Sequence, residues 1–180
     1  PEGTAGDTTV ALTWTAPETD NGSAGTSYVV QYSTNGGTSW TAFSSGSPIT
    51  ITSATVTGLS NGTAYVFQVA AVNGVGQGAW SDASAAVTPR TTPGAPSAPV
   101  GVPGDQSLTA SWSAPASDGG SAVTDYVVQY SSNSGTSWDT FADGESTTAS
   151  ATVTGLVNGT AYTFRVAASN VAGQGAWSDP

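Results

Sequence analysis

The stretch TVTGLSNGTAYVFQVAA, residues 55–71, decides the fold, because apolar and polar side chains alternate on either side of an Asn-Gly pair. Tyr65, Phe67 and Val69 recur at every second position after that pair. A period of two places such side chains on one face of a β-strand. Asn61-Gly62 supplies residues that tolerate the positive φ of a tight turn. The stretch therefore predicts short strands joined by a turn.

The same stretch returns at residues 152–168 as TVTGLVNGTAYTFRVAA. Trp14 recurs as Trp112, 98 residues later, and Tyr65 recurs as Tyr162, 97 residues later. Loss of one residue between these positions is typical of a loop or an edge. A chain of 180 residues with such a repeat is expected to form two small modules.

Period-two apolar runs and turn dipeptides continue through both copies, and no comparable helical periodicity is present. Val10, Leu12 and Trp14 share one face, and Tyr28 and Val30 share another. Many short strands separated by Gly-containing turns are typical of an antiparallel sandwich. We therefore predict an all-β chain of two tandem immunoglobulin-like antiparallel β-sandwiches.

Both copies resemble the fibronectin type III family over nearly the whole chain. The resemblance rests on a Trp in the second strand, Tyr-x-Val-x-Tyr in the third, and the stretch at residues 55–71 with its copy. It implies a tyrosine corner, in which a buried phenol bonds to the backbone of the preceding turn. The predicted structural residues are the two core indoles and the two corners: Trp14, Leu59, Tyr65, Trp112, Leu156 and Tyr162.

The predicted domains are residues 1–91 and 95–180, joined by a Pro-rich segment, residues 88–99, that should act as a stiff spacer. Residues 83–88 are predicted to form the last strand of the first domain. The second copy lacks this stretch, so its last strand is expected to be missing. Either the strand belongs to a longer array, or another subunit supplies it by strand addition at the open edge.

The composition excludes several classes of function. Charged residues make up 8% of the chain, Lys is absent, and Arg90 and Arg165 are the sole cations against twelve acidic residues, which gives a net charge of −10. Nucleic acid and anionic membrane surfaces are therefore not expected partners. No run of about 18 apolar residues is present, so membrane insertion is not expected. Without Cys or His, no cofactor is expected, and catalysis would have to use carboxylates and hydroxyls alone.

Five side chains are candidates for facing a ligand: Trp40, Trp138, Trp80, Trp177 and Arg165. Trp40 and Trp138 follow hairpin turns, where an indole can stack on a sugar ring or pack over the sheet edge. Trp80 and Trp177 are expected in a Gly-rich loop, where capping of the core is favoured over binding. Arg165 is expected to face outward and to stack on Trp177, as in the ladder of cytokine-receptor relatives of this fold. Gln68 at the matching position argues against a role shared by both copies.

Several turns match binding or modification patterns. Asp20-Asn21-Gly22 and Asp118-Gly119-Gly120 lack the alternating acidic ligands of a calcium loop, so we interpret them as turns. Asn21, Asn61 and Asn158 each begin a glycosylation acceptor pattern. For the last two a structural role in the turn is favoured.

The expected function is that of a non-catalytic structural or adhesive repeat at the cell surface or outside the cell, acting as a rigid spacer in a larger surface, fibre or secreted protein. A surface of Thr, Ser, Gly and Ala without Lys resembles that of bacterial secreted repeat proteins. Its expected partners are neighbouring repeats of the same chain, with a protein or a polysaccharide as further options. The alternative is a carbohydrate-binding accessory module of a polysaccharide-degrading enzyme. No integrin-binding Arg-Gly-Asp peptide is present.

Overall fold

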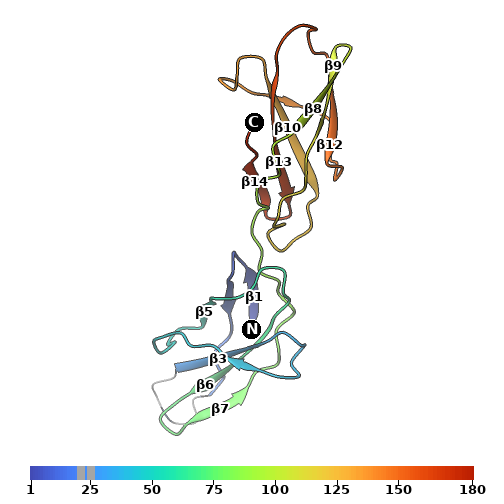
Figure 1. Cartoon of the computed structure of the whole chain (residues 1–180). Helices are drawn as coiled ribbons and strands as arrows, with labels where there is room; N and C mark the ends of the chain where they lie inside the picture. Colours follow the sequence, from blue (N-terminus) through green and yellow to red (C-terminus); the bar gives the residue numbers. More distant parts are fainter. Residues whose placement is uncertain (20–22, 24–26) are drawn as a thin grey trace. The chain divides into compact units, whose positions relative to one another are not determined.

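The computed structural model describes residues 1–19, 23 and 27–180, which form two units, Pro1–Arg90 and Thr91–Pro180 (Figure 1). Residues 92–94, which the sequence left between the predicted domains, belong to the second unit. The predicted turn at Asp20-Asn21-Gly22, with its acceptor Asn21, lies outside the described residues.

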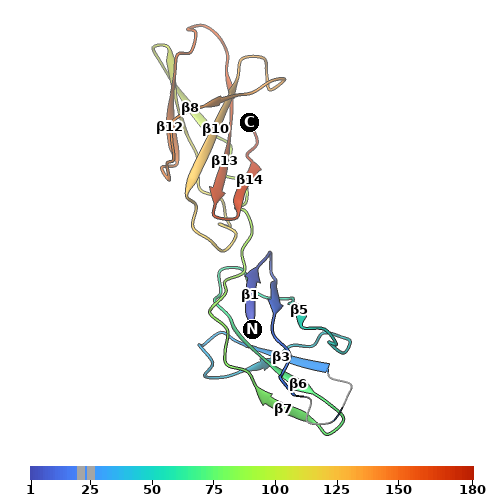
Figure 2. The same cartoon turned by 180° about the vertical axis from the view of Figure 1, so that it is seen from behind.

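The first unit consists of two antiparallel sheets (Figures 1 and 2). The three-stranded sheet has the order β1-β2-β5 and contains β1 (Glu2–Ala5), β2 (Val10–Thr13) and β5 (Ser53–Val56). The four-stranded sheet has the order β4-β3-β6-β7 and contains β4 (Thr41–Ala42), β3 (Ser27–Ser33), β6 (Val66–Val72) and β7 (Gln77–Trp80).

The second unit repeats this design. Its three-stranded sheet, in the order β12-β9-β8, contains β8 (Val100–Gly104), β9 (Ser107–Ser111) and β12 (Ser150–Thr154). Its four-stranded sheet, in the order β11-β10-β13-β14, contains β10 (Asp125–Ser131), β11 (Asp139–Phe141), β13 (Thr163–Asn170) and β14 (Gly173–Trp177). The described residues form no helix, and the predicted pair of all-β sandwiches is confirmed.

Each unit has its own core between its two sheets. In the first unit the period-two residues Val10, Leu12 and Phe67 are at most 1% exposed. The predicted core indoles pack edge-on against a tyrosine, with 5.3 Å between the ring centroids of Trp14 and Tyr28. The second unit repeats the pair at 5.4 Å with Trp112 and Tyr126. Such edge-to-face contacts fix the ring orientation in addition to burying apolar area.

Burial of the two core indoles costs free energy at their N–H groups. The Nε1 atoms of Trp14 and Trp112 are buried and have no hydrogen-bond partner within the described part of the chain. A buried donor without a partner costs about 1–3 kcal/mol. The recurrence of this arrangement in both units indicates that the apolar area of the indole outweighs the cost.

The last strand of the first unit differs from its prediction at residues 83–88. The last regular strand, β7, ends at Trp80, before the predicted range. After it, only every third residue forms backbone hydrogen bonds with the segment from Tyr65 to Val69. The N–H groups of Ser81, Ser84 and Val87 donate to the carbonyl oxygens of Val69, Phe67 and Tyr65.

The reason is that serine side chains take part in the pairing. The hydroxyls of Ser81 and Ser84 accept hydrogen bonds from the N–H groups of Val69 and Phe67, at 3.1 and 3.0 Å. A serine side-chain oxygen thus takes the place of a backbone carbonyl as the acceptor. As a result, the paired residues are three positions apart in residues 81–87 but two positions apart on the β6 side. In the second unit Ser178 makes the same pair of bonds with Val166.

Candidate functional site

The candidate site lies on the outer face of the four-stranded sheet of the second unit. Arg165 on β13 alternates with the inward residues Phe164 and Val166, which are buried. The register places Arg165 beside Gln129 of β10, and Gln129 beside Thr140 of β11. One outward row of side chains therefore crosses three strands.

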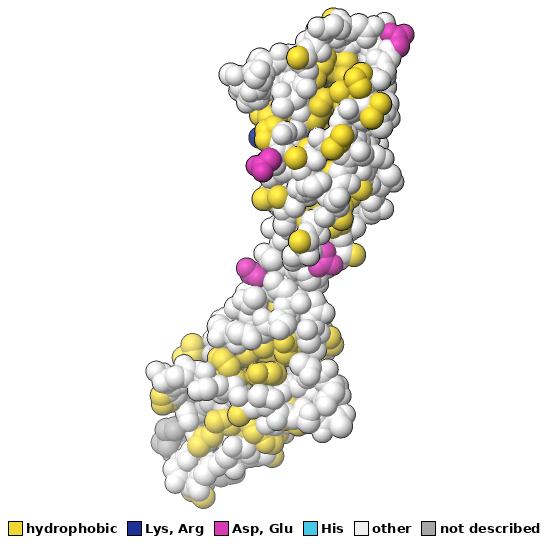
Figure 3. All heavy atoms as spheres, in the orientation of Figure 1, with side chains coloured by type: hydrophobic (Ala, Val, Ile, Leu, Met, Phe, Trp, Pro, Cys, Tyr) yellow, Lys and Arg dark blue, Asp and Glu magenta, His cyan; other side chains and the backbone are white. Residues whose placement is uncertain are grey.

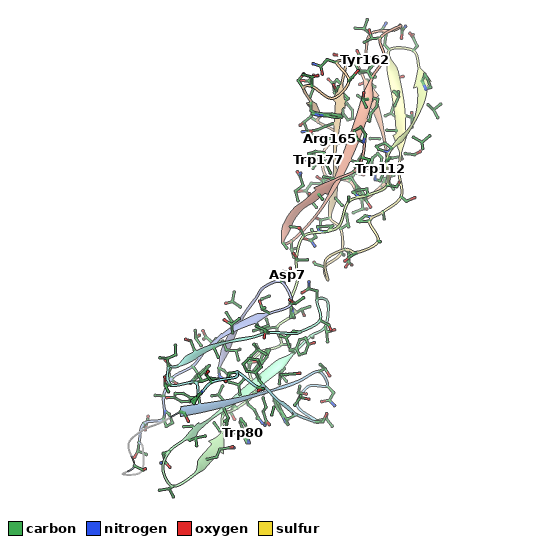
Figure 4. The ribbon with its side chains drawn as sticks, turned by 60° about the vertical axis from the view of Figure 1, so that its left-hand side comes forward. Asp7, Trp80, Trp112, Tyr162, Arg165 and Trp177 are labelled. Carbon is green, nitrogen blue, oxygen red and sulfur yellow. The ribbon has the colours of Figure 1, made fainter. Side chains whose placement is uncertain are left out.

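The guanidinium of Arg165 lies between two indoles. Its Cζ atom is 4.3 Å from the ring centroid of Trp138 and 4.5 Å from that of Trp177; Figure 4 shows Arg165 beside Trp177. A guanidinium over an indole face is attracted by the ring quadrupole. The expected contact with Trp177 is present, and Trp138 adds a second contact that the sequence did not suggest.

Gln129 holds the guanidinium of Arg165 on the outer face of the sheet. Both Nε and Nη2 of Arg165 donate to Gln129 Oε1, at 2.9 and 2.6 Å. Gln129 Nε2 in turn donates to Thr140 Oγ1 at 3.0 Å. Because a delocalised cation is held by an amide oxygen and two rings, Arg165 covers one face of each indole.

A hydrogen-bonded turn holds Trp138 in place. Ser131 is 1% exposed, and its hydroxyl donates to Asn133 Oδ1 and accepts from the N–H of Gly135. Gly135 has a φ of +84°, and a Cβ there would lie 3.2 Å from Cζ2 of Trp138. The indole therefore packs over the turn, a placement that differs from the two expected from the sequence, over the sheet edge or on a sugar ring.

The first unit has the same turn but different outward side chains across its four-stranded sheet. Trp40 packs over Gly37, where a Cβ would lie 3.1 Å from its Cζ2 atom. Gln68 occupies the position of Arg165 and pairs with Gln31, so two neutral amides stand where the second unit has a cation. Trp80 is 36% exposed. The two units therefore share the indoles but not the cation.

The placement of Trp80 and Trp177 in a loop was wrong. Trp80 ends β7 and Trp177 ends β14, and Gly78 and Gly175 lie inside those strands. The Gly-rich composition suggested a loop, but glycine inside a strand also permits the close approach of another backbone. That approach is observed at Gly175, as described below.

The predicted corners have the following geometry. The hydroxyl of Tyr65 accepts a hydrogen bond from the N–H of Ser60 at 3.0 Å, and that of Tyr162 accepts from Val157 at 3.1 Å. Leu59 is 4% and Leu156 is 7% exposed. Each corner thus ties the turn before β6 or β13 to the core.

The sequence missed a second tie at the same end of each unit, here called the asparagine clamp. Asn61 Oδ1 accepts from the N–H of Thr8, and its Nδ2 donates to Asp7 Oδ1, both at 2.8 Å. In the second unit, Asn158 bonds in the same way to Gln106 and Asp105. Thr8 has a φ of +51°. Asn61 and Asn158, which each begin a glycosylation acceptor pattern, therefore use both Oδ1 and Nδ2 in hydrogen bonds within the unit.

Acidic side chains are sparse on the face drawn in Figure 3. Partial burial, opposed by a backbone hydrogen bond and supported by the nearby charge of Asp125, raises the pKa of Asp143 above its ordinary value. Burial likewise raises the pKa of the Tyr126 phenol. The described residues contain no group of three or more carboxylate, His or Cys side chains that could hold a metal ion. Asp118 accepts from the N–H of Gly120 at 2.8 Å, as in a turn.

The fibronectin type III domain model matches residues 3–87 and again residues 94–180. The chain belongs to the fibronectin type III family. Its relatives come from different kinds of organism. It is 31% identical to M-protein of striated muscle from Gallus gallus over 177 residues, which is 96% of this chain and 12% of that protein. It is 37% identical to chitinase A1 from Niallia circulans over 174 residues, which is 91% of this chain and 22% of that protein.

A solved structure shows the same fold. The crystal structure of a set of titin domains aligns with 98% of this fibronectin type III chain and 58% of the titin chain, with a TM-score of 0.61 and 23% identity. The described residues contain no helix with the length and apolar character needed to cross a membrane. This chain spans about an eighth of the muscle protein and about a fifth of the chitinase.

Proposed function

We propose that this pair of fibronectin type III domains is a non-catalytic structural repeat that serves as a rigid spacer within a larger extracellular surface, fibre or secreted protein, with neighbouring repeats as its first partners. The tyrosine corner and the asparagine clamp recur in both units. The cation of the outer row does not recur. The internal hydrogen bonds that stabilise each unit are therefore repeated, whereas the charged surface residue is not. This pattern is typical of repeats whose role is to extend a chain.

One observation carries the spacer proposal. Arg90 donates its N–H to the carbonyl of Gly6 in the first unit, and Thr91 donates its N–H to the carbonyl of Gly119 in the second. Consecutive residues are thus bound to different units. A connection without free residues has little freedom to bend, and Pro89 and Pro93 on either side stiffen it further.

Small-angle X-ray scattering of the whole chain tests this proposal. The control variant has Gly-Ser-Gly-Ser inserted between Arg90 and Thr91. We expect the native chain to give a narrower distribution of maximum dimensions than the insertion variant, because the four added residues are a flexible coil. Equal distributions would contradict a rigid spacer.

The extracellular and bacterial setting is also a proposal. It is supported by the composition rich in Thr, Ser, Gly and Ala and without Lys, and by the likeness to a chitinase from a bacterium, whereas the muscle relative is an animal protein. Fractionation of cells that express the full parent protein, with an antibody against this chain, would locate it. Signal confined to the cytoplasm would refute this part.

Polysaccharide binding is a second candidate function, favoured by the 36% exposure of Trp80 and by the indoles of Trp138 and Trp177 on the outer face of the second unit. Aromatic planes on an exposed sheet are suited to stacking on sugar rings. Retention of the native chain on chitin, cellulose or peptidoglycan, lost in Trp80→Ala, would establish it. Passage of the native chain through all three would exclude it.

Strand addition by another subunit belongs to this proposal as well. Leu108 and Tyr162 of the second unit are half-buried, whereas their counterparts Val10 and Tyr65 are 0% and 5% exposed. An added strand would cover them, as Val87 covers this edge of the first unit. Light scattering at high protein concentration tests this, and a monodisperse monomer would exclude it.

A further inference from the structure

A groove in the first unit lies beside β7. Its lining includes Ala16 and Pro17 after β2, Asn73 at the end of β6, and Gly76 and Gly78 around the start of β7. The groove has a volume of about 560 Å³. We call it the first-unit groove, and its described lining carries no charged side chain.

In the second unit the corresponding place is filled by the chain itself. Residues 91–94, Thr-Thr-Pro-Gly, run along the counterparts of the groove residues. Asn170 Nδ2 donates to the carbonyl of Thr91 at 2.8 Å, and Gly94 donates its N–H to the carbonyl of Ser117 at 2.9 Å. A Cβ at Gly94 would lie 3.8 Å from Cβ of Pro115.

The two glycines at the same place in β7 and β14 show what the groove is shaped for. A Cβ at Gly175 would overlap the carbonyl oxygen of Pro93 and lie 2.9 Å from its carbonyl carbon. A Cβ at Gly78 would meet only the carbonyl oxygen of Ala71, at an ordinary 3.5 Å. Neither glycine has a positive φ. The packed segment explains Gly175, and nothing packed on the described first unit explains Gly78.

Glycine inside a strand lowers its stability, and it is found where another backbone approaches closely. Gly76 and its counterpart Gly173 both have a positive φ, which by itself favours glycine, and the docked segment reaches the second of them, since a Cβ at Gly173 would lie 3.7 Å from Cγ2 of Thr92. The first unit thus has the lining of a site whose occupant is seen only in the second.

We propose that the first-unit groove is the docking site for an extended, uncharged Thr-Thr-Pro-Gly type segment that is attached ahead of Pro1 through about four further residues, as the linker from a preceding repeat. The attached source follows from the second unit, where residues 95–98 join the segment to Pro99, the counterpart of Pro1. The inference rests on the proposed spacer function, because docked linkers would stiffen each join of an array. The occupant is recognised by its backbone, with a proline carbonyl above Gly78.

The test uses the whole chain with residues 91–98, Thr-Thr-Pro-Gly-Ala-Pro-Ser-Ala, fused ahead of Pro1, compared with an extension of eight Gly and Ser residues. We expect the amide resonances of residues 73–79 to shift, and their hydrogen exchange to slow, with the native extension alone. Gly78→Val in the extended chain should abolish both effects, since its side chain fills the place of the proline carbonyl. Gly78→Val without an extension controls for the folding of the first unit.

Gly175→Ala provides the positive control, because its Cβ must displace Pro93. We expect it to shift the amide resonances of residues 91–94, whereas Gly78→Ala in the unextended chain leaves the first unit unperturbed. Absence of any shift at residues 73–79 in the extended chain would overturn the proposal. Binding of the free peptide of residues 91–98 as strongly as the attached one would overturn the attached source. Neither result alters the scattering test of the join at Arg90, so the two proposals fail separately.

Discussion

The hydroxyl of Tyr65 accepts a hydrogen bond from the backbone N–H of Ser60 at 3.0 Å, although the ring itself is only 5% exposed. The phenol therefore buries its apolar ring and still satisfies its oxygen at the turn. The ring lies 5.6 Å from that of Tyr32 in an edge-on contact. The turn before β6 is thus connected directly to the packing of the four-stranded sheet.

Removal of this hydroxyl should loosen the turn without creating a cavity. We expect Tyr65→Phe to lower the free energy of unfolding of the first unit by about 0.5–1.5 kcal/mol, the usual net contribution of a hydrogen bond. Urea denaturation followed by intrinsic fluorescence measures the loss. Tyr162→Phe is the matched variant in the second unit, and unchanged unfolding midpoints in both would contradict a stabilising corner.

The asparagine clamp predicts a pH-dependent variant. Asn61→Asp keeps the shape and the acceptor for Thr8, but it replaces the N–H donor toward Asp7 with a carboxylate oxygen. We expect a loss of about 1–2 kcal/mol at pH 7, from a lost hydrogen bond and a like-charge repulsion of about 1 kcal/mol. Repulsion raises the pKa of the introduced carboxyl in the folded state, so the loss should shrink as the pH falls through that pKa. Urea denaturation at pH 7 and pH 4 tests this, with Asn61→Ala, whose loss should not shrink, as the control.

The stacked cation should stabilise the second unit alone. We expect Arg165→Gln, which copies the residue found at position 68, to lower the free energy of unfolding by about 1–2 kcal/mol, since two contacts of about 0.5–1 kcal/mol each are lost. Arg165→Lys should lose nearly as much, because an ammonium cannot lie flat between two rings while bonding to Gln129. Chemical denaturation of both variants is compared with Arg90→Gln, which removes the other arginine. A loss no larger than that of Arg90→Gln would disprove the stabilising role of the stack.

The buried indole N–H of Trp112 predicts which of two substitutions lowers the free energy of unfolding more. Trp112→Ala should cost about 3–5 kcal/mol, as for other large aromatic truncations in a core. Trp112→Phe should cost much less, because it keeps an aromatic ring beside Tyr126 and removes a buried N–H without a partner. Thermal and urea unfolding of the two variants measure the difference. Equal losses would show that the indole shape, and not its area, stabilises the core.

Asp143 should reduce stability at neutral pH. Its carboxyl has a pKa above the ordinary 3.8, mainly because of partial burial. The folded state then binds the proton more tightly than the unfolded state, so stability falls as the pH rises from that ordinary value through the raised one. We expect Asp143→Asn to be more stable than the native chain at pH 7 and equal to it at pH 3. Urea midpoints at both values check this, and Glu145→Gln, which removes a neighbouring charge, should not reproduce the pattern.

The sandwiches could be predicted from the sequence because burial of one sheet face requires a period of two, and the stretch at residues 55–71 follows that period in both copies. The position of the last strand could not. Ser81 and Ser84 have side chains that replace a carbonyl, and this changes the step of the pairing from two residues to three. Composition alone does not distinguish such a serine from an ordinary exposed one.

The candidate site was predicted in part. Arg165 was expected to face outward, since Phe164 and Val166 on either side are apolar. Its second ring contact depends on the register of β10 with β11, which brings the turn before β11 over β13. Register between strands is set by turn geometry and packing, so the contact with Trp138 had no local signal. Likewise, Asn61 and Asp7 are far apart in the chain and meet only in the folded unit.

The three-residue spacing of the segment that pairs with β6 affects which strands could add to this sheet edge. A sheet edge with unpaired groups at every second residue is a template for a foreign strand. Chains of similar tandem modules are especially exposed to such misassembly, because each copy contains strands that fit the next. From Ser81 to Val87 the edge presents its groups out of step with any regular strand. An edge with this spacing is therefore a poor template for a regular strand of a neighbouring module.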